Sequence, residues 1–85
     1  MTFKTDNRFD RDYARLPDQL KERVKKQLAL LMANPHHPSL QAHKMEGRDD
    51  IWEARITREY RLTFTLEGDT CHLRRVGTHE IYRHP

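Results

Sequence analysis

The sequence has few of the residues that mark several common kinds of functional site. It contains one cysteine, Cys71, among 85 residues, so no disulfide can form within the chain. Its three glycines, Gly47, Gly68 and Gly77, lie far apart, which excludes a glycine-rich phosphate loop. No apolar stretch approaches the roughly 20 residues of a membrane-spanning helix, and the charged first residues lack the apolar stretch of a signal peptide. We therefore expect a cytoplasmic protein with no membrane partner.

The sequence gives little indication of a metal site or of a nucleophilic cysteine, although the chain contains six histidines. His36 and His37 are neighbours whose side chains diverge on most backbones, and no two histidines have the helical spacing of a zinc site. Cys71 is in phase with Leu73, which predicts a small buried side chain rather than a nucleophile. The sequence therefore predicts no metal and no cofactor.

Charge is abundant, and its distribution is uneven. Charged residues make up 34% of the chain and hydrophobic residues 35%, but the apolar residues form periodic runs that are typical of a folded protein. The length suits one modest core, so we expect a single domain over residues 1–85. The 16 Lys and Arg exceed the 13 Asp and Glu, and arginines gather after residue 54. A net charge of +3 is by itself a weak indication of nucleic-acid binding.

The first 35 residues predict a short strand followed by two helices. Residues 2–5 are extended, and Asp6 is a candidate cap for a short helix that carries Phe9 and Tyr13 four apart, with Leu16 continuing the stripe. Pro17 is well placed as the first residue of a longer helix that ends at Asn34 and Pro35. The apolar positions of this helix share one face: Leu20, Val24, Leu28 and Leu31, with Met32 alongside.

The second half of the chain changes to the period of two that is typical of strands. Residues 35–50 have no sustained period and predict an ordered loop with a short turn at residues 39–40, held by Leu40 and Met45. Strands follow at about 52–56, 60–66 and 70–77, with a hairpin turn at 67–69. Because Val76 has the opposite parity to Leu73, we expect a bulge or an early end in the third strand.

These elements predict an α+β fold in the order β-α-α-β-β-β, with the two helices packed on one face of an antiparallel sheet. The other face is left for polar groups. By parity it carries Glu53, Arg55, Arg61 and Thr63.

Several titratable and cationic side chains are expected on that face and its flanking loops: His43, Lys44, Arg55, Arg61, His79 and Tyr82. Metal-free RNA cleavage needs help for the attacking 2′-hydroxyl, a proton for the leaving 5′-oxygen and positive charge over the phosphate, and histidine, tyrosine and arginine supply these. Simpler readings stay open, because strand arginines often serve solubility and Tyr82 could pack against the fold. Trp52 is more typical of a core than of a base-stacking platform. The residue types alone indicate a basic α+β domain that could bind RNA.

The order and spacing of several segments are similar to those of the RelE/ParE toxin superfamily of bacterial type II toxin–antitoxin modules. The similar segments are "HPSL" at 37–40, "KMEG" at 44–47, "WEARI" at 52–56, "YRLTF" at 60–64 and "RVGTHEIY" at 75–82. The likeness covers nearly the whole chain. It implies an mRNA interferase, a ribosome-dependent endoribonuclease that cuts the message without a metal, with the ribosome and mRNA as partners. It also implies a cognate antitoxin, and a higher-order toxin–antitoxin complex that binds operator DNA.

The resemblance also implies roles for individual residues. The "GTH" tail resembles the YafQ-like branch, in which His79 would transfer a proton and Tyr82 would stand near a terminal aromatic residue. His43 matches a loop histidine and is a candidate base, whereas Arg55 stands where that branch has a histidine. With Arg61, Arg55 would clamp the phosphate as in the RelE-like branch. The residues expected to bind RNA are Lys44, Arg48, Arg58 and Arg75.

The resemblance is also compatible with two other functions. ParE-like members have the same fold and inhibit DNA gyrase without nuclease activity. An inactive homologue that binds only its antitoxin is the third reading.

Overall fold

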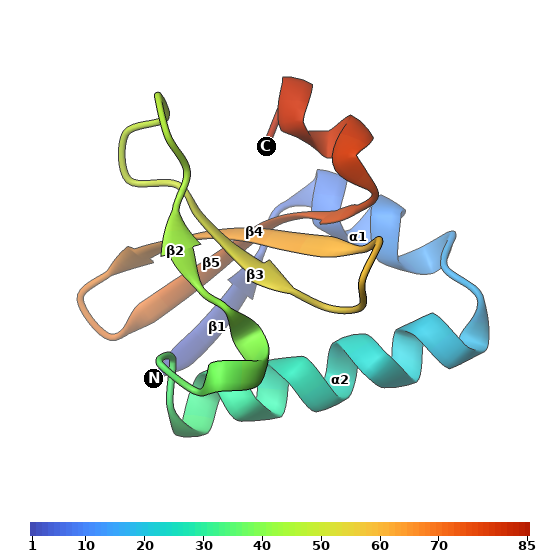
Figure 1. The fold of residues 1–85 in the computed structure, drawn as a ribbon, viewed down its shortest axis with the longest axis horizontal. Coiled ribbons are helices and arrows are strands. Elements are labelled where there is room, and N and C mark those ends of the chain that lie inside the picture. Colours follow the sequence, from blue (N-terminus) through green and yellow to red (C-terminus); the bar gives the residue numbers. More distant parts are fainter.

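The computed structural model describes residues 1–85 and contains two α-helices, two short 3-10 helices and one five-stranded sheet (Figure 1). The helical elements are α1 (Asn7–Ala14), α2 (Asp18–Ala33), η1 (Pro38–Leu40) and η2 (His79–Arg83). The strands are β1 (Thr2–Thr5), β2 (His43–Lys44), β3 (Trp52–Arg55), β4 (Arg61–Glu67) and β5 (Thr70–Gly77). The expected α+β class, with two helices packed against a sheet, is confirmed.

The helix boundaries follow local capping chemistry. The Asp6 carboxylate accepts a hydrogen bond of 2.8 Å from the Arg8 backbone N–H and so caps α1, as predicted. That hydrogen bond is the main reason why the pKa of Asp6 lies below its ordinary value. Pro17 was predicted to be the first residue of α2, but it precedes the helix in an extended conformation, with ψ at 152°. Its carbonyl accepts from the N–H groups of Leu20 and Lys21 and closes the first turn.

The sheet has the strand order β1-β5-β4-β3-β2. The β3–β4 and β4–β5 pairs are antiparallel as predicted, and β2, which was not predicted, pairs antiparallel with β3. However, β1 runs parallel to β5, so the sheet is mixed. The region 35–50 is also more regular than an ordered loop, because His43 and Lys44 form a two-residue edge strand. The turn expected at 39–40 is present as η1, where Leu40 is fully buried.

The expected bulge in the third strand is confirmed. Thr63 pairs with Arg75 and Phe64 pairs with Leu73, so Arg74 is the extra residue of β5. The bulge reverses the parity of the strand, and both Leu73 and Val76 are therefore buried.

The core lies between the helices and one face of the sheet, and α2 runs along the lower side in Figure 1. The fully buried apolar residues of this layer include Val24, Leu31, Ala54, Ile56 and Leu62. Met32 was expected to lie alongside the apolar stripe of α2, but this residue is 48% exposed. The buried residues of α2 include the polar Gln27. The Gln27 amide donates to the Arg55 carbonyl at 2.8 Å and so ties α2 to the end of β3.

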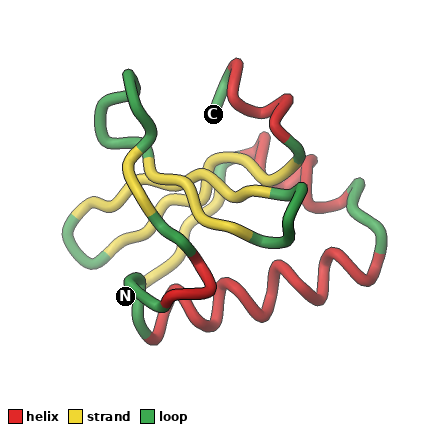
Figure 2. Tube along the Cα trace, viewed as in Figure 1, coloured by secondary structure: helices red, strands yellow, loops and turns green.

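The opposite face of the sheet carries η2, the last helical turn of the chain (Figure 2). Neither α1 nor α2 combines the length and the apolar character that crossing a membrane would require.

Candidate active site

Cross-strand register collects polar side chains on the face of the sheet that carries η2. Directly paired residues share a face, and one row of such pairs crosses four strands: His43, Glu53, Thr63 and Arg75. The next row contains Arg55, Arg61 and Gly77. The predicted polar face is therefore present.

Glu53 is the centre of this arrangement. Its side chain is only 11% exposed, yet it has three polar neighbours. The Tyr82 hydroxyl donates to Glu53 Oε1 at 2.6 Å, and Arg61 Nε lies 3.4 Å from the same oxygen. His43 Nε2 lies 3.8 Å from Glu53 Oε2. Oε1 is thus engaged by two donors, while Oε2 faces the imidazole across a longer gap.

Tyr82 is held as a hydrogen-bond donor. Burial, followed by the hydrogen bond to the Glu53 carboxylate and the charge of Glu53, raises its pKa to about 12. The phenol therefore stays protonated at neutral pH. It can orient Glu53 or contact a base, but it does not serve as a proton acceptor.

Arg61 is fixed in place by the chain that precedes it. Its Nη1 donates to the carbonyl oxygens of Thr57, Arg58 and Tyr60 at 2.6, 2.9 and 3.1 Å. With Nη1 engaged in this way and Nε near Glu53, the guanidinium is immobilised in the turn between β3 and β4. A cation held in this way is suited to bind a phosphate, because little side-chain entropy is lost on binding.

His79 lies at the exposed start of η2 and lines a surface pocket of about 510 Å³ together with Arg58, Arg61 and Tyr82. The approach of η2 to the sheet is close at Gly77. A Cβ added there would lie 2.9 Å from Ile81 Cγ2, so a side chain at residue 77 would force Ile81 or η2 to shift. The pocket thus places an imidazole beside the Arg61–Glu53–Tyr82 group.

The structure brings together four of the five residues that were expected to be catalytic. His43, Arg61 and Tyr82 surround Glu53, and His79 shares a pocket with two of them. The fifth, Arg55, pairs with Arg61 in the register, but its side chain forms no hydrogen bond or ion pair and does not line the pocket.

The four expected RNA-binding residues are dispersed. Arg58 lines the pocket of His79, and Arg48 donates to the carbonyl oxygens of Tyr82 and Arg83 at the end of η2. Lys44 follows His43 in β2 and so points to the opposite face, where its Nζ lies 5.8 Å from the centre of the Trp52 ring. Arg75 binds Asp12 of α1 through two hydrogen bonds and lies apart from His79.

Comparison with known proteins shows where this fold occurs. No protein-family model and no curated protein matches the sequence. Solved structures do match. YafQ from E. coli strain BL21(DE3) has a TM-score of 0.76 at 18% identity over 94% of each chain. The YoeB/ParE toxin from Agrobacterium tumefaciens has a TM-score of 0.81 at 18% identity, over 93% of this chain and 99% of that chain.

A third match is the RelB–RelE antitoxin–toxin complex from Methanococcus jannaschii, with a TM-score of 0.75 at 23% identity over the whole of both chains. The chain has the RelE/ParE toxin fold. The resemblance given by the sequence segments is thus confirmed at the level of the fold.

Within this RelE/ParE fold, Glu53 is the residue that sequence reasoning placed on the polar face without giving it a role. Its signal was a carboxylate in mid-strand, flanked by Trp52 and Ala54. Such a position is unfavourable for a carboxylate unless partners satisfy it. No group of three or more His, Cys, Asp or Glu side chains forms a possible metal site.

Proposed function

We propose that this protein is the toxin of a type II toxin–antitoxin pair and that it cleaves mRNA on the ribosome without a metal. The observation that carries the proposal is the grouping of a buried carboxylate, a fixed guanidinium and an exposed imidazole: Glu53, Arg61 and His79. The fold that the chain shares with RelE and YafQ toxins supports it.

The grouping supplies each requirement of RNA cleavage by internal attack. Glu53 Oε2 accepts the proton of the 2′-hydroxyl, whose oxygen bonds to the adjacent phosphorus while the bond to the 5′-oxygen breaks. His79 donates a proton to that leaving oxygen, and the products are a 2′,3′-cyclic phosphate and a 5′-hydroxyl. Arg61 stabilises the negative charge that grows on the phosphate during the attack.

Glu53 replaces His43 as the proposed base. The His43 side chain is 60% exposed, and its Nδ1 lies 2.9 Å from the Gln41 carbonyl. A carbonyl oxygen only accepts, so Nδ1 carries a hydrogen and Nε2 faces Glu53. His43 supports the carboxylate only as an imidazolium, because Nε2 then carries a hydrogen as well, and Tyr82 orients Glu53 from the other side.

We also propose a cognate antitoxin as the partner. Two of the matching structures are the E. coli DinJ–YafQ toxin–antitoxin complex, with a TM-score of 0.78, and the RelB–RelE complex. A short domain with a cationic, polar face suits an antitoxin segment that folds on binding. In cells the protein would then act in the cytoplasm, where its messages and ribosomes are.

Primer extension on a reporter message in a purified translation system tests the proposal. We expect cuts with the wild-type protein that require ribosomes and that disappear with His79→Ala. His84→Ala is the matched control, because His84 is an exposed histidine of the same tail that does not line the pocket of His79. Absence of cuts with the wild-type protein, combined with inhibition of DNA supercoiling by gyrase, would assign the chain to the ParE type of activity instead.

A further inference from the structure

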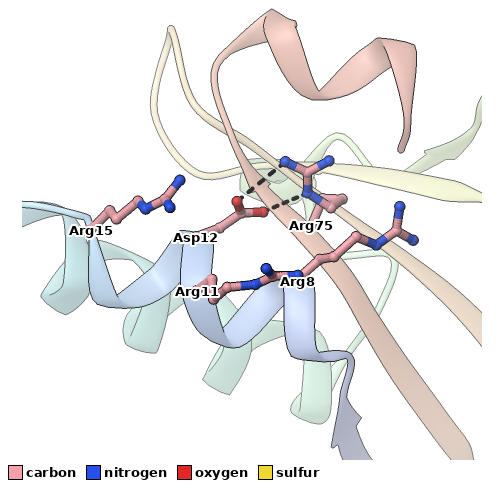
Figure 3. A pocket seen from close by; sticks show the side chains of 5 residues that line it. All are labelled: Arg8, Arg11, Asp12, Arg15 and Arg75. Atoms are coloured by element: carbon pink, nitrogen blue, oxygen red, sulfur yellow. Dashed lines mark hydrogen bonds and ion pairs between the residues drawn. The ribbon is translucent and has the colours of Figure 1, made fainter.

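A second cationic surface lies on α1, apart from the pocket of His79. Arg8, Arg11 and Arg15 follow one another at spacings of three and four residues and so lie on one face of the helix. Arg75 of β5 completes the surface, whose hollow of about 210 Å³ is lined by these four arginines and Asp12 (Figure 3). The face is opposite to the one that buries Phe9.

The single carboxylate of this surface is already fully engaged. Asp12 accepts hydrogen bonds from Arg75 Nε and Nη2 at 2.6 and 3.2 Å and from the Val76 N–H at 3.2 Å. It thereby covers the edge of β5 beyond the point where β1 ends. Asp12 and Arg75 hold α1 to the sheet, and little of the Asp12 charge is left to neutralise the other arginines.

The remaining guanidinium groups are available to a ligand. Arg11 and Arg15 are exposed and their side chains form no ion pair or hydrogen bond, while Arg8 has one weak contact, 3.5 Å from Asp6. Like charges at these helical spacings repel each other, so folding gains nothing from their grouping. An anionic ligand would relieve the repulsion.

The lining of this surface favours a polyanion over a peptide. None of the five lining residues is hydrophobic, whereas peptides and proteins gain most of their affinity from apolar or aromatic anchors that become buried. A nucleic-acid backbone needs no such anchor, because it binds through phosphate contacts and the release of counterions. Arginine suits this role since its planar group donates two parallel hydrogen bonds to a phosphate.

The α1 surface also lies close to the pocket of His79. A third hollow, of about 530 Å³, shares Arg15 and Arg75 with the α1 surface and Thr78 and Glu80 with the pocket of His79. The two cationic sites are thus neighbours around η2. An RNA bound at one of them can extend to the other.

We propose that Arg8, Arg11 and Arg15 form a second RNA-binding surface, which contacts backbone phosphates of folded RNA away from the bond that is cut. The choice of RNA as the polyanion rests on the proposed function. The surface reads no sequence, because phosphate contacts position a protein without specifying bases.

Salt-dependent binding of a defined probe tests the proposal. The probe is a fluorescein-labelled RNA hairpin with a stem of about 20 base pairs, 2′-O-methylated so that it cannot be cut, and anisotropy is followed between 50 and 200 mM KCl. The double variant Arg11→Gln/Arg15→Gln should bind two unrelated hairpins equally weakly. Its slope of log K against log salt should be shallower by about two units, since each lost phosphate contact removes about 0.9.

Lys25→Gln/Lys26→Gln is the charge-matched control on the exposed face of α2, and it should leave the slope unchanged. Circular dichroism verifies that both double variants fold. An unchanged slope for the α1 variant overturns the proposal, as does a wild-type protein that does not bind the hairpin. Loss of binding to a polyglutamate peptide, with RNA binding retained, would also overturn it and assign the surface to an acidic protein segment.

The cleavage assay is run separately on the same proteins, so the two proposals can fail independently. A wild-type protein that binds the hairpin through α1 but never cuts a message would refute the nuclease and leave the RNA-binding surface standing. Cleavage that depends on His79, together with α1 substitutions that leave the slope of log K against log salt unchanged, would support the nuclease and refute the RNA-binding surface.

Discussion

Replacing Glu53 by glutamine separates the catalytic role of this residue from its structural one. The substitution keeps the shape of the side chain and an oxygen that can accept from Tyr82, but it removes the negative charge near Arg61. Arg61 keeps its three carbonyl partners in residues 57–60. One charge-assisted contact of 3.4 Å is lost, which should cost about 1 kcal/mol and lower Tm by about 4–8 °C.

The effect on cleavage should be much larger than the effect on stability. If Glu53 is the base, the variant loses a contribution of about 10²–10⁴ to the rate. Single-turnover cleavage on programmed ribosomes measures this rate directly. Glu67→Gln, at an exposed carboxylate of the β4–β5 hairpin, is the control and should cut at the wild-type rate.

The Tyr82 hydroxyl reports whether the substitution has acted at the intended place. Burial is the main reason why the pKa of Tyr82 is about 12, and the hydrogen bond and charge of Glu53 add to it. In Glu53→Gln the charge is gone, so this pKa should move back toward its ordinary value near 10. Tyrosinate absorbance during alkaline titration follows the change, and Tyr82→Phe identifies the group.

The same titration makes stability depend on pH in a known direction. Because the pKa of Tyr82 is raised in the folded protein, its contribution is fully present below about pH 10 and is lost as the pH rises toward 12. The urea midpoint should fall over that range, and less so in the variant. Cleavage within about threefold of the wild-type rate, together with a lowered pKa of Tyr82, would refute Glu53 as the base.

Two further substitutions and one thiol probe test the packing and hydrogen bonds that hold β5, α1 and η2 together. Gly77→Ala places a Cβ 2.9 Å from Ile81 Cγ2, so Ile81 or η2 must shift; we expect a loss of about 1–3 kcal/mol in urea unfolding and weaker cleavage. Asp12→Ala leaves the Val76 N–H and the Arg75 guanidinium without their acceptor and should cost about 2–4 kcal/mol in the same assay, whereas an unchanged midpoint would show that water replaces the carboxylate. Burial raises the pKa of the Cys71 thiol to about 11, so Ellman's reagent should react with it only at the rate of unfolding, and rapid reaction in the native protein would contradict its burial.

The parts of the fold that could be predicted from the sequence are those that have a clear period. Four apolar residues at helical spacing located α2, and alternation over residues 60–66 located β4. The hairpin turn at 67–69 and the matching phase of Cys71 and Leu73 located β5. Even the bulge at Arg74 was detectable, because Leu73 and Val76 have opposite parity but are both apolar.

The remaining features depend on tertiary contacts that leave no local pattern. A two-residue strand such as β2 has no period, and only its pairing with β3 makes it a strand. The direction of β1 relative to β5 is likewise set by the path of the chain through the helices. The placement of the site residues depends on the same tertiary contacts. One step along β2 separates His43, beside Glu53, from Lys44, beside Trp52.

The bulge also explains why the tail of the chain lies where the candidate site needs it. Without the extra residue, Thr63 would face Arg74, and Val76 rather than Gly77 would lie beside Arg61 on the polar face. The strand would then turn an apolar side chain, instead of glycine, toward the polar face. With the bulge, the only small residue of the segment lies under η2, and the first residue of that turn is His79. A single inserted residue in β5 therefore completes the core at Val76 and also brings the imidazole and the phenol to the face that holds Glu53.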